Sequence, residues 1–275
     1  MIPKRIIQTW KTTDIPRRYR AYQRQLRRLH PDYEYLLMTD EEVDSFVRRE
    51  YPEYAQAFDD LQDFISRIDL FRLLAVHKMG GFYFDLDVCI SKPLDDLLDQ
   101  ACIFPFERQM DAYGSALLGT IEMLGQYAFG AQAGHPFLRA CADNIRRTTL
   151  DSDFARAPSR EILDSVLPAI IRDRGFMRVL YTAGPAMITR TLLEQPEGSE
   201  DVRILAAHGR NSRRKVKHVF GVYGAHQMSG TWLTHAQFSG LWRLLSRLRL
   251  RHKLRLLAKA ESHLSRELLT VERLT

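Results

Sequence analysis

Cysteine is scarce in this chain, and long apolar runs are missing. The 275 residues include three cysteines, Cys89, Cys102 and Cys141, with no C-x-x-C pair. This sparse, odd count argues against a cysteine-built zinc site and is typical of a reducing compartment. No apolar run approaches the roughly 18–20 residues that a membrane-spanning helix needs, and residues 1–10 lack the pattern of a signal peptide. We therefore expect a cytoplasmic protein.

The excess of positive charge is confined to the C-terminal segment. The formal net charge is +6, yet residues 1–240 hold 31 basic and 31 acidic residues, while residues 241–275 hold nine basic and three acidic ones. Basic residues recur there at every fourth position beside leucines, namely Arg243, Arg247, Arg251, Arg255 and Lys259. This predicts an amphipathic helix whose basic side faces an anionic membrane, through residues 241–259, or solvent. No recognition motif supports a nucleic-acid partner.

Strand and helix patterns alternate along the first 90 residues. Strands are expected at residues 2–10, 33–38 and 82–84, and helices at 17–28, 41–50 and 61–79, with Asp40 as the N-cap of the second helix. Gly80-Gly81 ends the third helix. The alternation predicts an α/β fold with helices flanking a sheet. We expect one domain over residues 1–240 and a helical appendage over residues 241–275.

Two aspartates, Asp85 and Asp87, directly follow the predicted strand 82–84. Functional residues of α/β sheets gather beyond the carboxyl ends of strands, and alternate residues of an extended segment point the same way. Paired carboxylates at such a place form a hard oxygen site for Mg²⁺ or Mn²⁺. Asp151 and Asp153 have the same spacing in a polar segment without a preceding strand, and we interpret that second pair as a solvated loop.

Asp69 and Arg72 lie three residues apart in the predicted helix 61–79, so they share one helix face. An exposed pair of this kind contributes less than about 1 kcal/mol to stability. Their neighbours Ile68, Leu70 and Phe71 are apolar, however, which predicts a largely buried helix. Charged residues on a buried helix usually have a partner or a function, and we interpret this pair as functional.

These motifs, in their order along the chain, resemble the DXD sugar-binding glycosyltransferases and, more closely, glycosyltransferase family 32. The matching residues are Ile2-Pro3-Lys4, Gln8-Thr9-Trp10, Asp69 with Arg72, Gly80-Gly81-Phe82-Tyr83-Phe84-Asp85-Leu86-Asp87 and Pro93-Leu94-Asp95. The chain is also similar to the catalytic domain of the large clostridial glucosylating toxins. The resemblance implies a GT-A-like, nucleotide-sugar-binding sheet, a nucleotide-diphosphate sugar donor, a divalent metal and retention at the anomeric carbon.

The resemblance also implies roles for individual residues. Asp87 would bind the metal, and Asp85 would contact the metal, the ribose or the sugar. Asp69 and Arg72 would hold the donor sugar. Four further residues would contact the donor or the metal: Trp10 by stacking on the base, Tyr83 near the nucleotide, Gln126 near the sugar, and His226 in the metal shell. Trp232 would close over the donor. A core tryptophan at position 10 and a structural histidine at position 226 are the alternatives.

The sequence thus predicts a retaining, Mn²⁺- or Mg²⁺-dependent hexosyltransferase. Its donor would be UDP- or GDP-linked and its acceptor a glycan, free or lipid-linked, in capsule, lipopolysaccharide or other surface polysaccharide synthesis, in the cytoplasm or at the inner membrane face. Three alternatives stay open. They are a toxin-like transferase with a protein acceptor, a haloacid-dehalogenase-like phosphatase that uses Asp85 and Asp87, and a non-catalytic basic module that binds membranes or nucleic acid.

Overall fold

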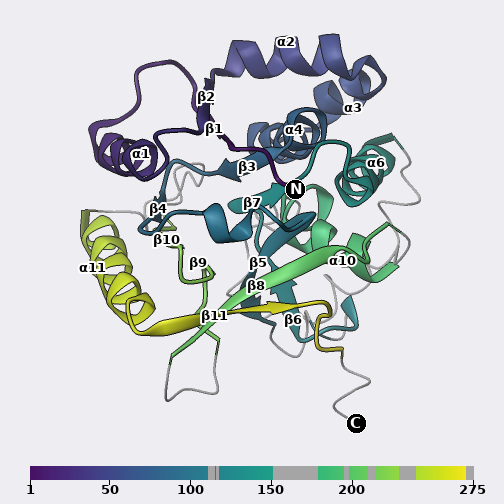
Figure 1. Cartoon of the computed structure of the whole chain (residues 1–275). Helices are drawn as coiled ribbons and strands as arrows, with labels where there is room; N and C mark the ends of the chain where they lie inside the picture. The colour runs from purple at the N-terminus through teal and green to yellow at the C-terminus, as the bar shows by residue number, and fades with distance from the viewer. Residues whose placement is uncertain are drawn as a thin grey trace.

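A computed structural model of the chain describes residues 1–110, 115, 118–150, 179–194, 198–209, 215–228 and 240–270. These residues form a mixed eight-stranded sheet covered on both faces (Figure 1). Its strands are β1 (Arg5–Thr9), β2 (Glu34–Met38), β3 (Gly81–Phe84), β5 (Cys102–Gln109), β6 (Glu122–Leu124), β7 (Ala128–Ala131), β8 (Val202–Gly209) and β11 (Ala260–Ser265). The α/β class predicted from the sequence is confirmed.

The strands follow the spatial order β11-β8-β5-β7-β3-β1-β2, with β6 paired to β5 off this path. β1 runs parallel to β2 and β3, and β5 runs parallel to β8. Between these two parallel groups lies β7, which is antiparallel to both β3 and β5. The carboxyl ends of β1 and β3 therefore meet at one edge of the sheet.

One face of the sheet packs against a layer of helices. This layer contains α2 (Asp40–Glu50), the 3₁₀ turn Pro52–Tyr54, α3 (Ala55–Asp60), α4 (Phe64–Met79), α6 (Pro136–Leu150) and α10 (Pro185–Glu194). α4 is buried on nearly all sides. From the sheet, Ile7 of β1 and Tyr83 of β3 contribute to the core shared with this layer.

The other face packs against a small antiparallel sheet and two helices. The small sheet has the order β4 (Val88–Ile90), β10 (Gly224–His226) and β9 (Val219–Phe220). The two helices are α1 (Arg17–Leu29) and α11 (Gly240–Leu257), and a 3₁₀ turn at Asp95–Leu97 follows β4. Phe82 and Phe84 of β3 belong to this second core, together with Leu250 of α11. Residues 85–87 connect the main sheet to the small one.

Two predicted helix boundaries are corrected. The helix expected over residues 61–79 begins at Phe64. The N-cap of α2 is Thr39 rather than Asp40. The Thr39 side chain accepts a hydrogen bond from the Glu42 N–H, and the Glu42 carboxylate accepts one from the Thr39 N–H at 2.7 Å. This reciprocal capping box satisfies two backbone donors, so Asp40 becomes the first helical residue.

The C-terminal segment also differs from the prediction. Residues 241–257 are helical, as expected, but residues 260–265, assigned to the same helical appendage, form β11. This strand pairs antiparallel with β8, from Ala260 opposite Gly209 to Ser265 opposite Ile204. Its sequence AESHLS has no clear apolar alternation, so the strand is set by pairing with the otherwise open edge of β8. Residues 271–275 lie outside the described residues.

Glycine is required where α4 turns into β3. Gly80 and Gly81 have φ values of 66° and 109°, which only glycine adopts readily. A Cβ on Gly81 would lie 2.7 Å from the carbonyl oxygen of Arg5 in β1. The two glycines thus allow β3 to lie close to β1, and this fixes the position of the segment that follows β3.

Candidate active site

Asp85 and Asp87 lie in a tight turn between β3 and β4. The Val88 N–H donates to the Asp85 carbonyl at 3.0 Å, and the Asp85 N–H donates to the Tyr127 carbonyl at 2.8 Å. The sequence pattern predicts an extended segment whose alternation would align the two carboxylates. In the structure a hydrogen-bonded turn brings their oxygens together.

His226 joins the two aspartates through strand pairing. In the β4–β10 ladder His226 lies opposite Val88, the residue after Asp87. Its Nε2 is 3.1 Å from Asp87 Oδ1, and its ring stacks on Tyr127 with a centroid distance of 4.4 Å. Asp85, Asp87 and His226 each offer a ligand atom, and these atoms all lie within 4.8 Å of one another. The three residues that the resemblance implied as metal ligands are therefore adjacent.

Arg72 connects α4 to this turn. Its Nη2 lies 3.0 Å from Asp69 Oδ1 and 3.5 Å from Asp85 Oδ1, and its Nη1 donates to the Gln126 carbonyl at 2.8 Å. The guanidinium also lies over the ring of Tyr83, 4.8 Å from the centroid. Arg72 and Asp69 are almost completely buried, so this is not a surface ion pair.

The hydroxyl of Tyr83 orients the first aspartate of the turn. It donates to Asp85 Oδ1 at 3.0 Å and lies 3.0 Å from Thr9 Oγ1 at the end of β1. Because Thr9 and Tyr83 belong to neighbouring parallel strands, the carboxyl edge of the sheet itself sets the direction of the Asp85 side chain. This is the position at which α/β sheets usually bind ligands.

Burial shapes the protonation of the site. It raises the pKa of Asp69 to about 7, against the opposing effect of Arg72. Burial works to lower the pKa of Arg72, but the carboxylates of Asp85 and Asp69 raise it, so Arg72 stays a cation. Burial would also lower the pKa of His226, yet the Asp87 carboxylate outweighs it and the pKa is raised. A fourth acid, Glu107, has its pKa raised to about 7 by burial.

The residues of the turn fit a divalent cation. Two carboxylate oxygens and one imidazole nitrogen are a mixed donor set, in which carboxylates suit Mg²⁺ and Mn²⁺ and imidazole suits transition metals. His226 Nδ1 is buried and makes no hydrogen bond to the described residues. A cation would also offset the excess of carboxylates around Arg72.

Comparison with known proteins agrees with this geometry. Residues 16–104 match the family profile described as a glycosyltransferase sugar-binding region containing the DXD motif. The matched segment contains both the Asp69–Arg72 pair and the Asp85–Asp87 turn. This part of the chain is similar to DXD glycosyltransferase regions.

Curated relatives of the chain include fungal mannosyltransferases. It is 31% identical over 188 residues to inositol phosphoceramide mannosyltransferase 3 of Schizosaccharomyces pombe, covering 68% of this chain and 44% of the relative. It is 42% identical over 98 residues to mannosyl phosphorylinositol ceramide synthase CSH1 of Saccharomyces cerevisiae, covering 36% and 26%. Over 280 residues it is 24% identical to the initiation-specific alpha-1,6-mannosyltransferase of Candida albicans, covering 84% and 72%. The chain spans less than half the length of the first of these relatives.

A solved structure shares the fold beyond the DXD region. The ligand-free glycosyltransferase domain of the YGT toxin aligns with a TM-score of 0.51 at 8% identity, covering 92% of this chain and 90% of that domain. At this identity the likeness concerns the fold alone. It extends the glycosyltransferase-domain architecture to the β5–β11 half of the sheet.

The residues expected to bind the donor lie at different distances from the turn of the DXD region. Gln126 is buried beside the ion pair, where its Nε2 donates to the Asp69 carbonyl at 3.2 Å and its Oε1 makes no hydrogen bond to the described residues. Tyr83 is buried and positions Asp85. Trp10 packs edge-on against Tyr19, in a cluster that includes Leu86 from the turn. Trp232 lies outside the described residues, as do Asp151 and Asp153.

Sequence reasoning missed two residues of the site. Glu107 on β5 interacts electrostatically with His226 and Asp85, and its Oε2 is buried without a hydrogen bond to the described residues. An acid within an apolar strand was the available signal. Lys253 of α11 donates to the His226 carbonyl at 3.0 Å, and burial lowers its pKa to about 8. Its sequence context, a basic helix, gave no such indication.

Proposed function

We propose that this chain is a metal-dependent, retaining glycosyltransferase that moves a hexose from a nucleotide-diphosphate sugar to a glycan acceptor. The observation that carries the proposal is the convergence of Asp85, Asp87 and His226 beside the buried Asp69–Arg72 pair. The names of the relatives favour mannose as the hexose, and the nucleotide is UDP or GDP. Retention at the anomeric carbon rests on the resemblance to family 32.

The residues of the site are suited to stabilise a diphosphate leaving group. A divalent ion held by the turn would stabilise the negative charge that develops on the leaving group. Arg72 would add charge-assisted hydrogen bonds to a phosphate or sugar hydroxyl, and its fixed position means that little reorganisation accompanies the reaction. Gln126 offers an acceptor, Oε1, beside the ion pair, and this atom accepts no hydrogen bond from the described residues. We assign no covalent nucleophile.

The acceptor belongs to the same proposal. A lipid-linked glycan agrees with the relatives whose names include ceramide, and surface polysaccharide synthesis would place such an acceptor at an anionic membrane. Residues 241–259 would contact that membrane. A protein acceptor is the alternative that the fold of the YGT toxin domain leaves open.

Donor binding is the direct test. Calorimetry with UDP- and GDP-sugars, with Mn²⁺, Mg²⁺ or neither, would compare the wild type with Asp87→Asn. Asp153→Asn is the matched control, because it removes one carboxylate from the second pair with the same spacing. We expect metal-dependent binding of one donor, lost in Asp87→Asn and unchanged in Asp153→Asn. NMR of the product then reports the anomeric configuration.

Two results would contradict the proposal. Binding that is insensitive to metal and to Asp87→Asn would remove the role of the turn. Phosphate release from phosphomonoesters without donor binding would favour the haloacid-dehalogenase-like alternative. Transfer to a protein but not to a glycan would keep the chemistry and change the acceptor.

A further inference from the structure

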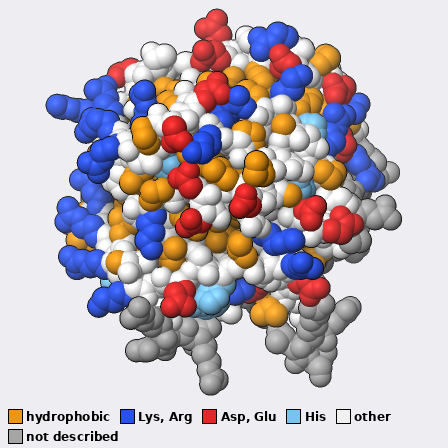
Figure 2. All heavy atoms as spheres, in the orientation of Figure 1, with side chains coloured by type: hydrophobic (Ala, Val, Ile, Leu, Met, Phe, Trp, Pro, Cys, Tyr) orange, Lys and Arg blue, Asp and Glu red, His pale blue; other side chains and the backbone are white. Residues whose placement is uncertain are grey.

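α1 and α11 are basic helices that contain no acidic residue. On α1, Arg17, Arg24 and Arg28 are exposed and form no ion pair with the described residues. On α11, Arg251 and Arg255 are likewise exposed and form none. Figure 2 shows the consequence: Lys and Arg side chains run down the left edge of the molecule, over the positions of α1 and α11 in Figure 1. Several arginines elsewhere, such as Arg48 and Arg139, are paired with acids.

The exposed side of α11 is also apolar. Ser246, Leu250 and Leu257 face the protein, whereas Leu244 and Leu248 are 53% and 49% exposed. At helical spacing these two leucines share a stripe with Arg251 and Arg255. The sequence alternatives were a basic face toward a membrane and a basic face toward solvent. The structure adds exposed leucines to that face. Exposed leucines beside arginines are typical of a helix that lies in a membrane interface.

The two helices are held together beside the active site. The Tyr22 hydroxyl of α1 donates to Gln227 Oε1 at 3.0 Å, and Gln227 Nε2 donates to Ser246 Oγ of α11 at 3.2 Å. Gln227 follows His226, and its N–H donates to the Asp87 carbonyl at 2.9 Å. One residue therefore ties both basic helices to the turn that would hold the metal.

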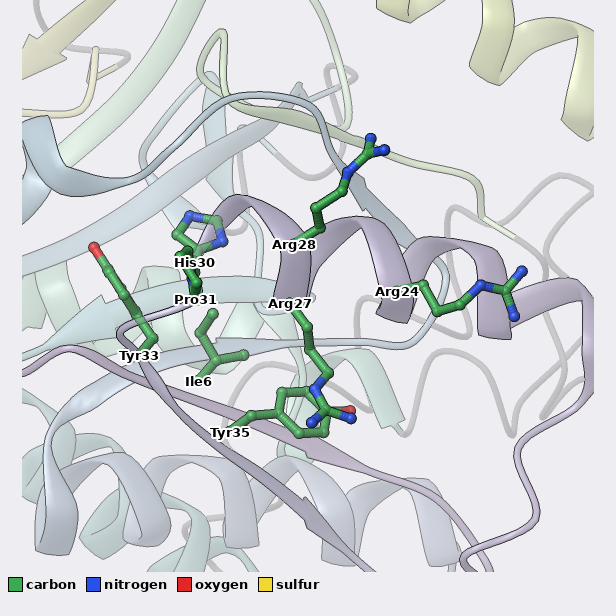
Figure 3. A pocket seen from close by; sticks show the side chains of 8 residues that line it. All are labelled: Ile6, Arg24, Arg27, Arg28, His30, Pro31, Tyr33 and Tyr35. Atoms are coloured by element: carbon green, nitrogen blue, oxygen red, sulfur yellow. The ribbon is translucent and has the colours of Figure 1, made fainter.

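A pocket lies at the C-terminal end of α1. It has a volume of about 470 Å³, and its lining combines three arginines with histidine and aromatic residues: Ile6, Arg24, Arg27, Arg28, His30, Pro31, Tyr33 and Tyr35 (Figure 3). Arg27 lies over the ring of Tyr35, 5.0 Å from its centroid. Arg24 and Arg28 extend from the same helix in directions that differ from that of Arg27 (Figure 3). Guanidinium groups of this kind recognise phosphate.

We propose that α1 and α11 form one docking surface for an anionic membrane, with the arginine pocket of α1 taking a lipid headgroup phosphate. Arginines supply attraction to the headgroups, and leucines of α11 enter the interface. The leucines favour a membrane over nucleic acid, which would be bound by charge alone. No helix among the described residues is long and apolar enough to cross a bilayer, so this contact would be peripheral. The inference deepens the proposed function by adding α1 to the contact with the acceptor's membrane.

The test measures how strongly the protein partitions onto lipid vesicles, in the absence of any glycosyl transfer. Sedimentation would compare vesicles of phosphatidylcholine alone with a mixture of phosphatidylcholine and phosphatidylglycerol. Two double variants each remove two charges from the proposed surface: Arg24→Gln with Arg28→Gln on α1, and Arg251→Gln with Arg255→Gln on α11. The control is Arg49→Gln with Lys78→Gln, which also removes two charges. Arg49 and Lys78 pair with Glu50 in the helix layer on the opposite face of the sheet. At about 1 kcal/mol per arginine, the α1 and α11 variants should each weaken partition about 30-fold, and the control should match the wild type. A fourth variant, Leu244→Ser with Leu248→Ser, should weaken the partition that persists at high salt.

Several outcomes would overturn the proposal. Equal partition onto both vesicle types would exclude an anionic surface. Loss in the α11 variant with none in the α1 variant would confine the contact to one helix. An equal loss in the control would show a general charge effect, and preferential binding to a DNA duplex would assign the surface to nucleic acid. Donor binding by the α1 and α11 variants should equal that of the wild type, so failure here is distinguishable from failure of the proposed function.

Discussion

The single side chain of Arg72 contacts three polar groups. Its guanidinium contacts Asp69, Asp85 and the Gln126 carbonyl, and it lies on the ring of Tyr83. A planar fork with several donors is needed to reach groups in different directions. The site therefore depends on the geometry of this residue as well as on its charge.

Replacing Arg72 by lysine should separate geometry from charge. The ammonium cannot keep all three contacts, and losing one charge-assisted hydrogen bond costs about 1.5–3 kcal/mol, so we expect donor affinity to fall about 10- to 150-fold. Arg67→Lys on the same helix is the matched control, because among the described residues Arg67 donates only to the Leu61 and Asp59 carbonyls. Calorimetric donor titration measures both, with urea denaturation as the check on folding. Wild-type affinity in Arg72→Lys would contradict the role assigned to the fork.

At the scale of elements, the sequence predicted those helices and strands that the local residue pattern determines. The helix expected over residues 61–79 has a period near 3.6, and residues 82–84 are a short apolar run. Both elements exist, although the helix begins at Phe64. The start of α2 was misplaced by one residue, because Asp and Thr are both good N-caps and only the Glu42 partner selects Thr39. β11 was missed because pairing with β8, over fifty residues earlier in the chain, determines it. His226 reaches Asp87 through the β4–β10 register, which the sequence pattern alone does not show.

The capping box makes a prediction at this scale. Thr39→Ala should destabilise the protein by about 1 kcal/mol, the usual cost of an N-cap. Asp40→Asn should cost less, because the Asp40 carboxylate acts through the helix dipole and the charge of Lys11 rather than as the cap. Thr13→Ala, at an exposed position outside any helix, is the control and should be neutral. Urea denaturation gives the three values. A larger effect for Asp40→Asn than for Thr39→Ala would restore Asp40 as the cap.

For the whole molecule, buried and half-buried histidines contribute to the response to acid. Burial lowers the pKa of His30, His77 and His135, and lowers that of His218 to about 3. In the unfolded chain these histidines bind protons near pH 6.5, whereas in the folded protein they stay neutral to lower pH. Each of them therefore lowers the free energy of unfolding as pH falls below about 6.5. Two buried acids, Asp69 and Glu107, act in the opposite direction because their pKa values are raised.

His30 isolates one of these contributions. Its Nδ1–H donates to the Leu26 carbonyl at 2.7 Å and its Nε2 accepts from the Leu94 N–H at 3.1 Å, and glutamine can supply one donor and one acceptor without titrating. Relative to the wild type, His30→Gln should lose less stability on acidification, by up to about 1.4 kcal/mol per pH unit below about pH 6.5. Urea denaturation at about pH 7 and about pH 5 measures the difference. Parallel stability curves for the two proteins would show that His30 is not held neutral.

The pairing of β11 with β8 makes the sheet depend on a segment that is synthesised after β8. While the chain is still being synthesised, the outer edge of β8 has no partner, and open strand edges invite association between nascent chains. α11 precedes β11, so the basic helix would be in place before the sheet is closed. Truncating the chain at residue 240 to remove that helix would also leave the β8 edge permanently open. Point substitutions on α11 are therefore the sounder way to change its surface, since they leave the closing strand in place.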